Sequence, residues 1–261
     1  MTDPRTHLTR RPFHDVLRIA PWHGRTDAAV VAPVPGTRAT PDDVTVVLGH
    51  LAAAGVTEVF TAALAPDEQL PFVDAGFAQH EHLHLLRHPL TDLPARGGSR
   101  LRRGWRGDYP AVLALDALAF DGFWRFDRRA LNEARAATPT GRFRVAHPPD
   151  LGVVGYAVVG AGFAIPTQGA PSPTDPDVPP AAGRQRRQRT AYLQRLAVHP
   201  DHQGRGIGTS LIADALWWAT RRGATELLVN TQERNGGALR LYEHLGFRRA
   251  TTGLDVLRWA A

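Results

Sequence analysis

Three glycines at alternate positions mark the segment of this 261-residue sequence with the clearest chemical character. The loop Gln203-Gly204-Arg205-Gly206-Ile207-Gly208 follows a predicted strand and precedes a predicted helix. Glycine lets the backbone come close to a ligand in conformations that a side chain forbids. The free N–H groups and the positive dipole end of the following helix suit a pyrophosphate, and Arg205 can add positive charge. The loop therefore predicts a site for a phosphorylated ligand.

Two other nucleotide-binding arrangements fit this loop less well. A dinucleotide-binding unit places such a loop after its first strand, with an acidic residue about 20 positions later at the end of the second strand. Here the loop follows an apparent antiparallel hairpin, and Glu226 stands at the start of its predicted strand. The sequence has no Gly-Lys-Ser/Thr segment, which excludes a P-loop.

Residues 104–261 resemble the GNAT superfamily of acyl-CoA-dependent N-acyltransferases in three motifs, which occur in the family's order and spacing. The loop pattern Gln/Arg-x-x-Gly-x-Gly/Ala is preceded by Leu-x-Val-x-Pro and followed by Asn-x-x-Ala-x-x-Leu-Tyr-x-x-x-Gly-Phe. The matching residues are Leu196, Val198, Pro200, Gln203, Gly206, Gly208, Asn235, Ala238, Leu241, Tyr242, Gly246 and Phe247.

The resemblance implies a role for each matched segment. The backbone groups of Leu196, Ala197 and Val198, on a strand that splays from its neighbour, would bind the pantetheine arm of acetyl-CoA and point an N–H at the thioester carbonyl. The loop and Thr209 would hold the pyrophosphate, while Asn235 would contact the cofactor arm. Tyr242 would protonate the departing thiolate. Without the neighbouring motif residues, this tyrosine would be interpreted as a core aromatic.

The sequence leaves the general base open. Many members of the family use a glutamate on the strand before the loop or on the next strand, where this sequence has Gln194 and the segment 230–232, Asn-Thr-Gln. A chain of water molecules is one alternative, and His199, Asp116 and Asp255 are others, without a ranking among them. The absence of an acid at 230–232 argues against a strongly cationic acceptor.

The elements around these motifs predict an α/β fold with a mixed sheet and helices on both faces, as the resemblance also implies. Hydrophobic periodicity predicts two helices, an antiparallel hairpin, and then alternating strands and helices. The expected helices are 111–120, 128–137, 209–222 and 236–245, and the expected strands are 142–147, 153–159, 191–198, 227–231 and 254–259.

The N-terminal part repeats the strand–helix–strand–helix unit that surrounds the loop. Segments 55–77 and 223–247 both open with Gly-x-Thr-Glu, continue into an apolar strand and place an aromatic residue four positions before Gly-Phe. The first copy has Pro-Gly-Thr-Arg-Ala-Thr at 35–40 in place of the loop, Phe72 in place of Tyr242 and Ala65 in place of Asn235. We therefore expect a degenerate GNAT-like domain at 1–95, a catalytic domain at 104–261, and a mobile loop at 166–190.

Composition narrows the possible chemistry and partners. There is no cysteine, so no acyl group can pass through a cysteine of the protein. All 31 basic residues are arginine and the net charge is +6, which we interpret mainly as the codon preference of a GC-rich genome, so nucleic acid is not an expected partner. No apolar stretch is long enough for a membrane span, and residues 1–13 lack a signal-peptide core. We expect a cytoplasmic protein, and a homodimer is compatible with the sequence.

His80, His82 and His84 alternate along a predicted strand at 78–86, and His88 lies beyond it. Histidine-x-histidine is a known metal-ligand spacing. The strand also alternates histidine with leucine, as an ordinary half-buried strand does, and no fourth ligand can be placed. We therefore expect no metal site.

Together these features predict an N-acetyltransferase that moves the acetyl group of acetyl-CoA to a primary amine by direct attack in a ternary complex. The acceptor is open between a protein N-terminus, a small amine and an aminoglycoside-like molecule. The alternative is a non-catalytic module that binds CoA as a sensor or structural ligand, or that binds nucleic acid through its arginine-rich surface. Turnover that depends on Tyr242 separates the two.

Overall fold

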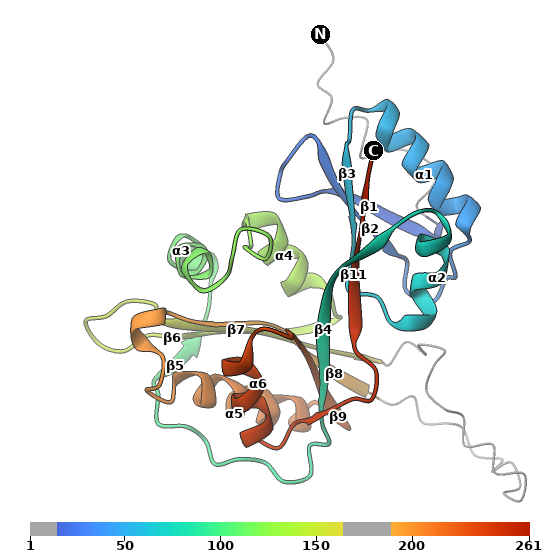
Figure 1. Ribbon diagram of the computed structural model, residues 1–261. Coiled ribbons are helices and arrows are strands. Elements are labelled where there is room, and N and C mark those ends of the chain that lie inside the picture. The colour runs from blue at the N-terminus through green and yellow to red at the C-terminus, as the bar shows by residue number, and fades with distance from the viewer. Residues whose placement is uncertain (1–14, 164–188) are drawn as a thin grey trace, which may run out of the picture. The chain divides into compact units, whose positions relative to one another are not determined.

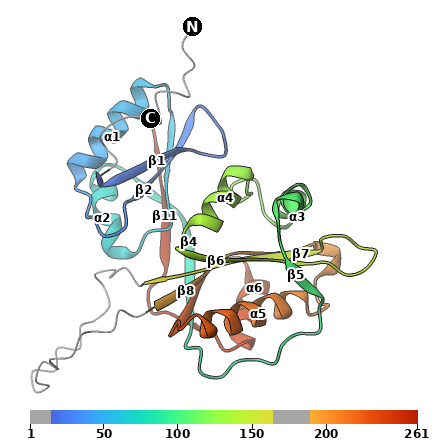
Figure 2. The same ribbon diagram turned by 180° about the vertical axis from the view of Figure 1, so that it is seen from behind.

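The computed structural model describes residues 15–163 and 189–261, which divide into two compact units (Figures 1 and 2). Nearly all of the loop expected at 166–190, and the N-terminal segment 1–13, lie outside the described residues. The described part of the first unit is 15–84 and 251–261, and that of the second is 85–163 and 189–250. The units therefore divide the chain differently from the expected ranges 1–95 and 104–261.

The first unit is a five-stranded sheet in the order β1-β2-β3-β11-β4, with α1 and α2 on the same face (Figures 1 and 2). Strands β1 and β2 are antiparallel, β2 and β3 are parallel, and β11 is antiparallel to both of its neighbours. The elements are β1 (Leu17–Pro21), β2 (Ala28–Pro33), α1 (Pro41–Ala53), β3 (Glu58–Thr61), α2 (Pro66–Asp74), β4 (Ala78–His88, of which 78–84 belong here) and β11 (Leu254–Ala260).

Strand β11 belongs to the first unit because its apolar residues complete that unit's core. Leu257 is 1% exposed and packs in a cluster with residues of α1, α2 and β2. The N–H of Leu257 also donates to the hydroxyl of the buried Thr61 at 2.9 Å. The periodicity of residues 254–259 correctly predicts a strand, but it does not show which sheet this strand joins.

The second unit contains a mixed sheet in the order β4-β9-β8-β7-β6-β5, with β10 beside β4. Strands β5 to β8 are antiparallel neighbours, whereas β8 and β9 are parallel. Helices α3 and α4 cover one face, and α5 and α6 cover the other (Figures 1 and 2). The elements are β5 (Leu101–Arg103), α3 (Tyr109–Ala119), α4 (Arg128–Ala136), β6 (Thr140–Ala146), β7 (Gly155–Phe163), β8 (Arg189–Val198), α5 (Ile207–Arg221), β9 (Glu226–Gln232), α6 (Gly236–His244) and β10 (Arg248–Arg249). The predicted α/β class with a mixed sheet is confirmed.

Both units contain the same series of elements. In the first, an antiparallel β1-β2 pair leads through α1 to the parallel strand β3 and then to α2. In the second, the antiparallel β7-β8 pair leads through α5 to the parallel strand β9 and then to α6. The element order therefore agrees with the internal repeat expected from the sequence.

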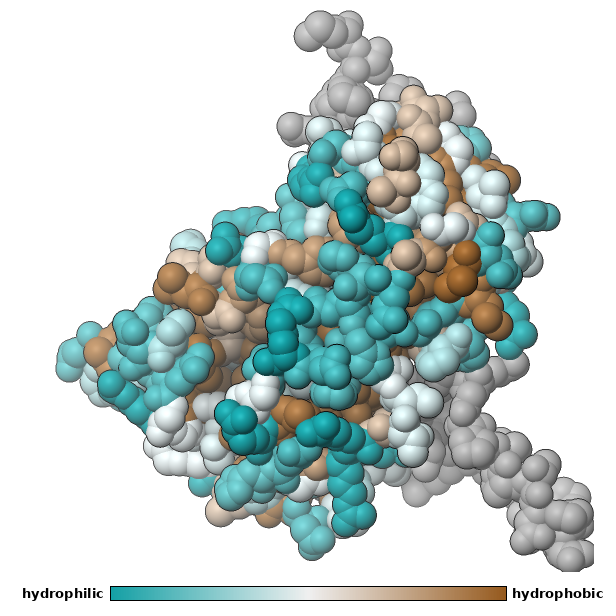
Figure 3. Space-filling model, in the orientation of Figure 1, coloured by the Kyte–Doolittle hydropathy of each residue, from teal (hydrophilic) through white to brown (hydrophobic). Residues whose placement is uncertain are grey.

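The surface is mixed in character. On the face drawn in Figure 3, apolar residues form separate patches among hydrophilic ones. The large apolar side chains that are exposed are Val46, Leu70 and Val73 in the first unit and Trp105, Leu118 and Leu151 in the second. Among the described helices, none combines the length and the apolar character needed to cross a membrane.

The packing of β11 generates a test of the division into units. Leu257→Ala should destabilise the first unit by about 2–5 kcal/mol, because it removes buried methyl groups and leaves a cavity. Hydrogen exchange should then speed up in residues 15–84 and stay slow in the strands and helices of 85–163 and 189–250. Thr252→Ala, an exposed change just before β11, serves as the control. Faster exchange confined to the second unit would contradict the assignment.

Candidate active site

The glycine-rich loop connects β8 to α5 in the second unit. After Val198 the chain makes a short 3-10 turn, in which the His199 ring nitrogen Nδ1 accepts from the Asp201 N–H at 3.2 Å. Gln203 then folds back and donates to the carbonyl of Val198 at 3.3 Å. Gly204 and Gly206 both have a φ of 74°, in the left-handed region that favours glycine. A Cβ at either glycine would meet no protein atom within 4 Å, so the space beside this backbone is open.

The N-terminus of α5 is not capped by a side chain. Gly206 is the N-cap residue and has no side chain that could accept from the first N–H groups of the helix. These groups lack intrahelical acceptors by the geometry of a helix, and they lie at the positive end of its dipole. Gly208 in the first turn lies close to α6, since a Cβ there would come within 2.9 Å of the Leu241 side chain. The loop therefore presents backbone donors to any anion placed beside it.

The corresponding helix of the first unit begins differently. Thr40 caps α1, and a capping box joins the Thr40 N–H to the Asp43 carboxylate at 2.9 Å and the Asp43 N–H to the Thr40 hydroxyl at 3.2 Å. Pro41 contributes no N–H. The N-terminus of α1 is thus closed by a carboxylate of its own first turn. The N-terminus of α5 has no such side chain, and its N–H donors stay available.

Strands β8 and β9 separate after a short paired region. They pair only at Thr190, Ala191 and Tyr192 in the part of the chain that the structure describes. Opposite β7, the register of β8 shifts at Gln194, which forms a bulge between Leu193 and Arg195. The remaining residues of β8, including Leu196 to Val198, therefore keep their ladder with β7 but not with β9. This confirms the expected splay and leaves backbone groups free along that edge.

Tyr242 lies on α6 and is 5% exposed, with its ring 5.4 Å from that of Phe247. Burial raises the pKa of its hydroxyl well above the usual value, and the positive charge of Arg195 offsets part of this rise. Within residues 15–163 and 189–261, this hydroxyl has no hydrogen-bond partner. Tyr242 therefore keeps its proton at neutral pH and can donate it to a ligand atom.

Asn235 has a structural task in addition to the predicted one. Its side-chain oxygen caps α6 by accepting from the Ala238 N–H at 3.1 Å. This bond commits the oxygen to the helix and leaves the amide NH₂ group as the part that can donate to a cofactor. The motif asparagine therefore fixes the start of the helix that carries Tyr242.

Arg195, which the sequence analysis did not single out, forms a buried ion pair with Asp116. Its Nε and Nη2 donate to the two Asp116 carboxylate oxygens, each at 2.8 Å, and Asp116 is fully buried. Asp116 also accepts from the Tyr156 hydroxyl and from the Phe126 N–H at 2.7 Å. The carboxylate therefore accepts four hydrogen bonds, so its oxygens are already engaged within the protein.

The same arginine holds the α3–α4 segment, residues 120–127, against β8. Its guanidinium lies between the rings of Phe120 and Phe126, at 3.4 and 4.0 Å from their centroids, and donates to the Trp124 carbonyl at 2.5 Å. The available sequence signal is the position of Arg195 between the apolar residues Leu193 and Ala197 in the predicted buried strand. A cation at such a position indicates a buried partner.

The three candidate bases have other engagements or lie elsewhere. Asp116 is bound to Arg195 as described, and Nδ1 of His199 accepts from a backbone N–H. Asp255 belongs to the first unit, where its Oδ1 lies 2.7 Å from Nδ1 of His82. The one carboxylate on β8 and β9 is Glu226, at the paired end of β9, where it accepts from Thr190 at 3.0 Å.

The histidines of β4 do not gather with further ligands. In the described ranges 15–163 and 189–261, no group of three or more histidine or acidic side chains is placed to hold a metal ion. His82 is engaged with Asp255, and its ring meets that of His84 edge to face at 5.8 Å.

The chain belongs to the acetyltransferase (GNAT) family, whose model matches residues 113–247. This range contains the open loop, the splayed strand and Tyr242, so the resemblance recognised in the three sequence motifs is confirmed for this part of the chain.

Several known proteins are similar to this chain. The mycothiol acetyltransferase of Rhodococcus jostii (strain RHA1) is 31% identical over 199 residues, which cover 70% of this chain and 58% of that protein. N-alpha-acetyltransferase 30 of Xenopus laevis is 35% identical over 77 residues, 27% of this chain and 28% of that protein. A tandem GNAT protein from the clavulanic acid biosynthesis pathway has a similar fold, with a TM-score of 0.58 and 14% identity, covering 90% of this chain and 75% of that one. The chain thus spans less than two thirds of the length of these curated relatives.

The buried ion pair generates a stability prediction. Asp116→Asn should destabilise the second unit by about 3–5 kcal/mol, because it leaves the Arg195 charge buried without a counter-charge. Asp121→Asn is the control: Asp121 pairs with Arg234 at 2.8 Å, but both side chains are more than half exposed, so the loss should stay below about 1 kcal/mol. Urea unfolding of both variants measures the difference, and equal losses would contradict the assigned importance of the buried pair.

Proposed function

We propose that this protein is an acetyl-CoA-dependent N-acetyltransferase that acetylates a primary amine. The observation that carries the proposal is the separation of β8 from β9 after Tyr192. An extended chain of alternating amide groups, such as pantetheine, can pair with the freed edge of β8 as a strand would. One N–H from Leu196 to Val198 then faces the thioester carbonyl and stabilises the negative charge that develops there when an amine attacks.

The loop before α5 supplies the anchor for the other end of the cofactor. The backbone N–H groups at the start of α5 and the open space beside Gly204 and Gly206 fit a pyrophosphate. Gln203, Arg205 and Thr209 flank these groups and add polar or charged donors. Acetyl-CoA, when bound, supplies the activated acetyl group and a thiol leaving group.

Tyr242 acts as the proton donor to the departing thiolate. Its raised pKa makes the free phenol a weaker acid than an exposed tyrosine, which at first sight opposes this role. The same exclusion of water also raises the basicity of a thiolate formed beside it, because desolvation disfavours both anions. Arg195 works in the favourable direction, since its positive charge lowers the pKa of the Tyr242 hydroxyl.

The acceptor is a primary amine that arrives in its neutral form or loses its proton to water. The engagement of Asp116 with Arg195 supports this view, because that carboxylate is already fully paired. The names of the relatives support two acceptor types, a protein N-terminus for N-alpha-acetyltransferase 30 and a small molecule for mycothiol acetyltransferase. We propose that the acceptor belongs to one of these types.

The first unit is a degenerate GNAT-like half without cofactor chemistry. The capping box of Thr40 and Asp43 fills the helix N-terminus where a pyrophosphate would otherwise lie. Phe72, which is fully buried, stands where the second unit has Tyr242 and has no proton to give. Catalysis would therefore belong to the second unit alone.

Substitution of Tyr242, the proposed general acid, distinguishes an enzyme from a non-catalytic CoA-binding module. Tyr242→Phe should lower turnover of acetyl-CoA with a panel of amines and peptides by about 10²–10⁴-fold, the usual contribution of general acid–base catalysis. Acetyl-CoA affinity, measured by calorimetry, should stay unchanged, since the ring and its packing remain. Phe72→Tyr in the first unit is the matched control and should not affect turnover. Unchanged turnover in Tyr242→Phe would remove the assigned role.

The glycine loop can be tested against its counterpart in the first unit. Gly206→Ala should weaken acetyl-CoA binding, because alanine is strained at a φ of 74° and its methyl group would enter the open space beside the loop. Gly36→Ala places the same strain at a φ of 85° in the first unit. Gly36→Ala should lower the stability of the chain about as much as Gly206→Ala does, without weakening acetyl-CoA binding. Equal losses of affinity in both variants would contradict a single cofactor site.

A further inference from the structure

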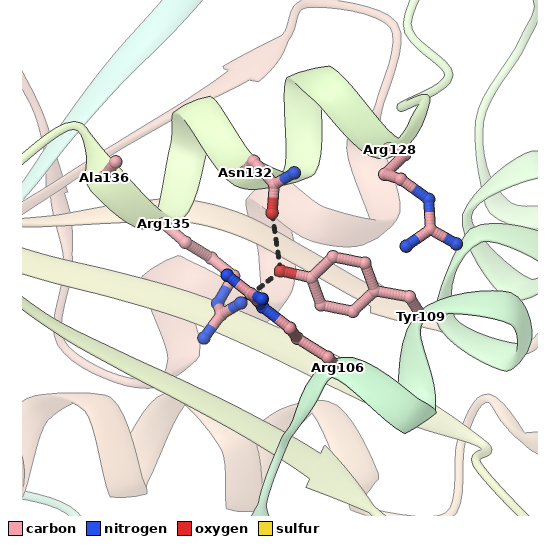
Figure 4. A pocket seen from close by; sticks show the side chains of 6 residues that line it. All are labelled: Arg106, Tyr109, Arg128, Asn132, Arg135 and Ala136. Carbon is pink, nitrogen blue, oxygen red and sulfur yellow. Dashed lines mark hydrogen bonds between the residues drawn. The ribbon is translucent and has the colours of Figure 1, made fainter.

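A second polar site lies on the α3–α4 face of the second unit, apart from the loop that begins α5. A pocket of about 580 Å³ lies between the start of α3 and one side of α4. Figure 4 shows the side chains that line it. Its lining residues are Arg106, Tyr109, Arg128, Asn132, Arg135 and Ala136. None of them belongs to β8, α5 or α6, the elements to which the proposed acetyl-CoA site is assigned. The pocket is in the size range of small-molecule sites.

The pocket is positively charged, and hydrogen bonds among its lining side chains preorganise its polar groups. Three of the six lining residues are arginines, and no carboxylate lines it among the described residues. Tyr109, which is 1% exposed, donates from its hydroxyl to the Asn132 side-chain oxygen at 2.7 Å and accepts from Arg135, as the dashed lines of Figure 4 show. Arg128 and Arg135 each lie 5.5 Å from the centroid of the Tyr109 ring.

Arg135 is the most informative member of this group. It is half-buried, and its guanidinium also lies 4.9 Å from the Phe143 ring centroid. Rings and a hydroxyl hold it in place, but no carboxylate of the described residues forms an ion pair with it. A guanidinium that is partly removed from water without a counter-charge gains from any anion that reaches it. The contrast is Arg129 on the same helix, which pairs with Glu133 at 2.7 Å.

The positive charge continues on the other side of Arg135. A neighbouring hollow is lined by Arg103, Arg135, Arg142, Arg144 and Arg222. Arg142 and Arg144 lie 2.6 and 3.4 Å from the Asp214 carboxylate, which they share. Asp214 therefore offsets the charge of two of the five arginines, and no carboxylate is among the described residues that line this second hollow, so the surface around Arg135 has a net positive charge. Such a surface attracts a ligand with several negative charges more strongly than a ligand with one.

We propose that the pocket around Tyr109 is a binding site for a small phosphorylated molecule, whose phosphate group is held by Arg106, Arg128 and Arg135. Guanidinium groups bind phosphate oxygens through paired hydrogen bonds, and three of them at one pocket match a dianionic group better than a single carboxylate. The size of the pocket and its short lining of six residues favour a small molecule over a nucleic-acid strand, which would need an extended groove. The site is independent of the transfer reaction and does not require that the proposed catalytic function be correct.

The test must separate this pocket from the loop that begins α5, since both are expected to bind phosphates. The full chain is saturated with CoA, which blocks the loop, and is then titrated with inorganic tripolyphosphate in a calorimeter. The double variant R106Q/R128Q removes two charges that are exposed and that pair with no carboxylate of residues 15–163 and 189–261, so it should fold normally. We expect it to bind tripolyphosphate about ten-fold more weakly or worse than the unmodified chain. The control R129Q should bind as the unmodified chain does.

Each other outcome overturns the proposal. Absence of tripolyphosphate binding in the presence of CoA would assign all phosphate binding to the loop. An equal loss of tripolyphosphate affinity in R129Q and R106Q/R128Q would show that the affinity depends on net charge and not on this pocket. Binding of a single-stranded oligonucleotide, but not of tripolyphosphate, that depends on Arg106 and Arg128 would make this face a nucleic-acid surface instead.

Discussion

The buried ion pair between Asp116 and Arg195 is the interaction on which the second unit's site depends. It joins α3 to the bulged strand β8 and fixes the 120–127 segment through two ring contacts and a carbonyl. A pair removed from water in this way is stable only when every donor and acceptor is satisfied, and Tyr156 and the Phe126 N–H complete the carboxylate's set. The geometry is therefore specific. One cation joins the strand that carries the proposed oxyanion donor to the 120–127 segment, and its charge also lowers the pKa of the Tyr242 hydroxyl, against the larger effect of burial.

The two units show how a small change at a helix N-terminus decides whether that end is open to an anion. Both contain a left-handed glycine in the turn before the helix, Gly36 and Gly206. In the first unit Thr40 and Asp43 close the end of the helix with their own oxygen atoms, while in the second Gly206 leaves it open. The capping box is a stabilising feature for α1. In α5 the missing cap leaves donors unsatisfied, which is consistent with a helix end that a ligand completes.

Much of the fold could be predicted from the sequence, and the reasons for the failures are physical. Apolar periodicity predicted α5, β8 and α6 to within about two residues, because α5 and α6 each pack an apolar face against the sheet and β8 is a buried strand of it. The splay of β8 followed from the family resemblance. Periodicity is local, so it could not show that β11 joins the first unit, since strand partners are set by long-range packing around residues such as Leu257. It also missed Arg195, whose partner lies 79 positions away, and it therefore left Asp116 among the candidate bases.

The position of β11 has a consequence for the order in which the chain acquires its structure during synthesis. The sheet of the first unit lacks an interior strand until residues 254–260 leave the ribosome, although the rest of that unit is made first. The second unit has all its strands once Arg249 has emerged. The edges of β3 and β4 that β11 will occupy therefore stay unpaired during the translation of about 170 residues, roughly 10–30 s at about 5–20 residues per second. Unpaired strand edges recruit other strands, so a nascent chain paused before residue 254 is the species most in need of protection from aggregation.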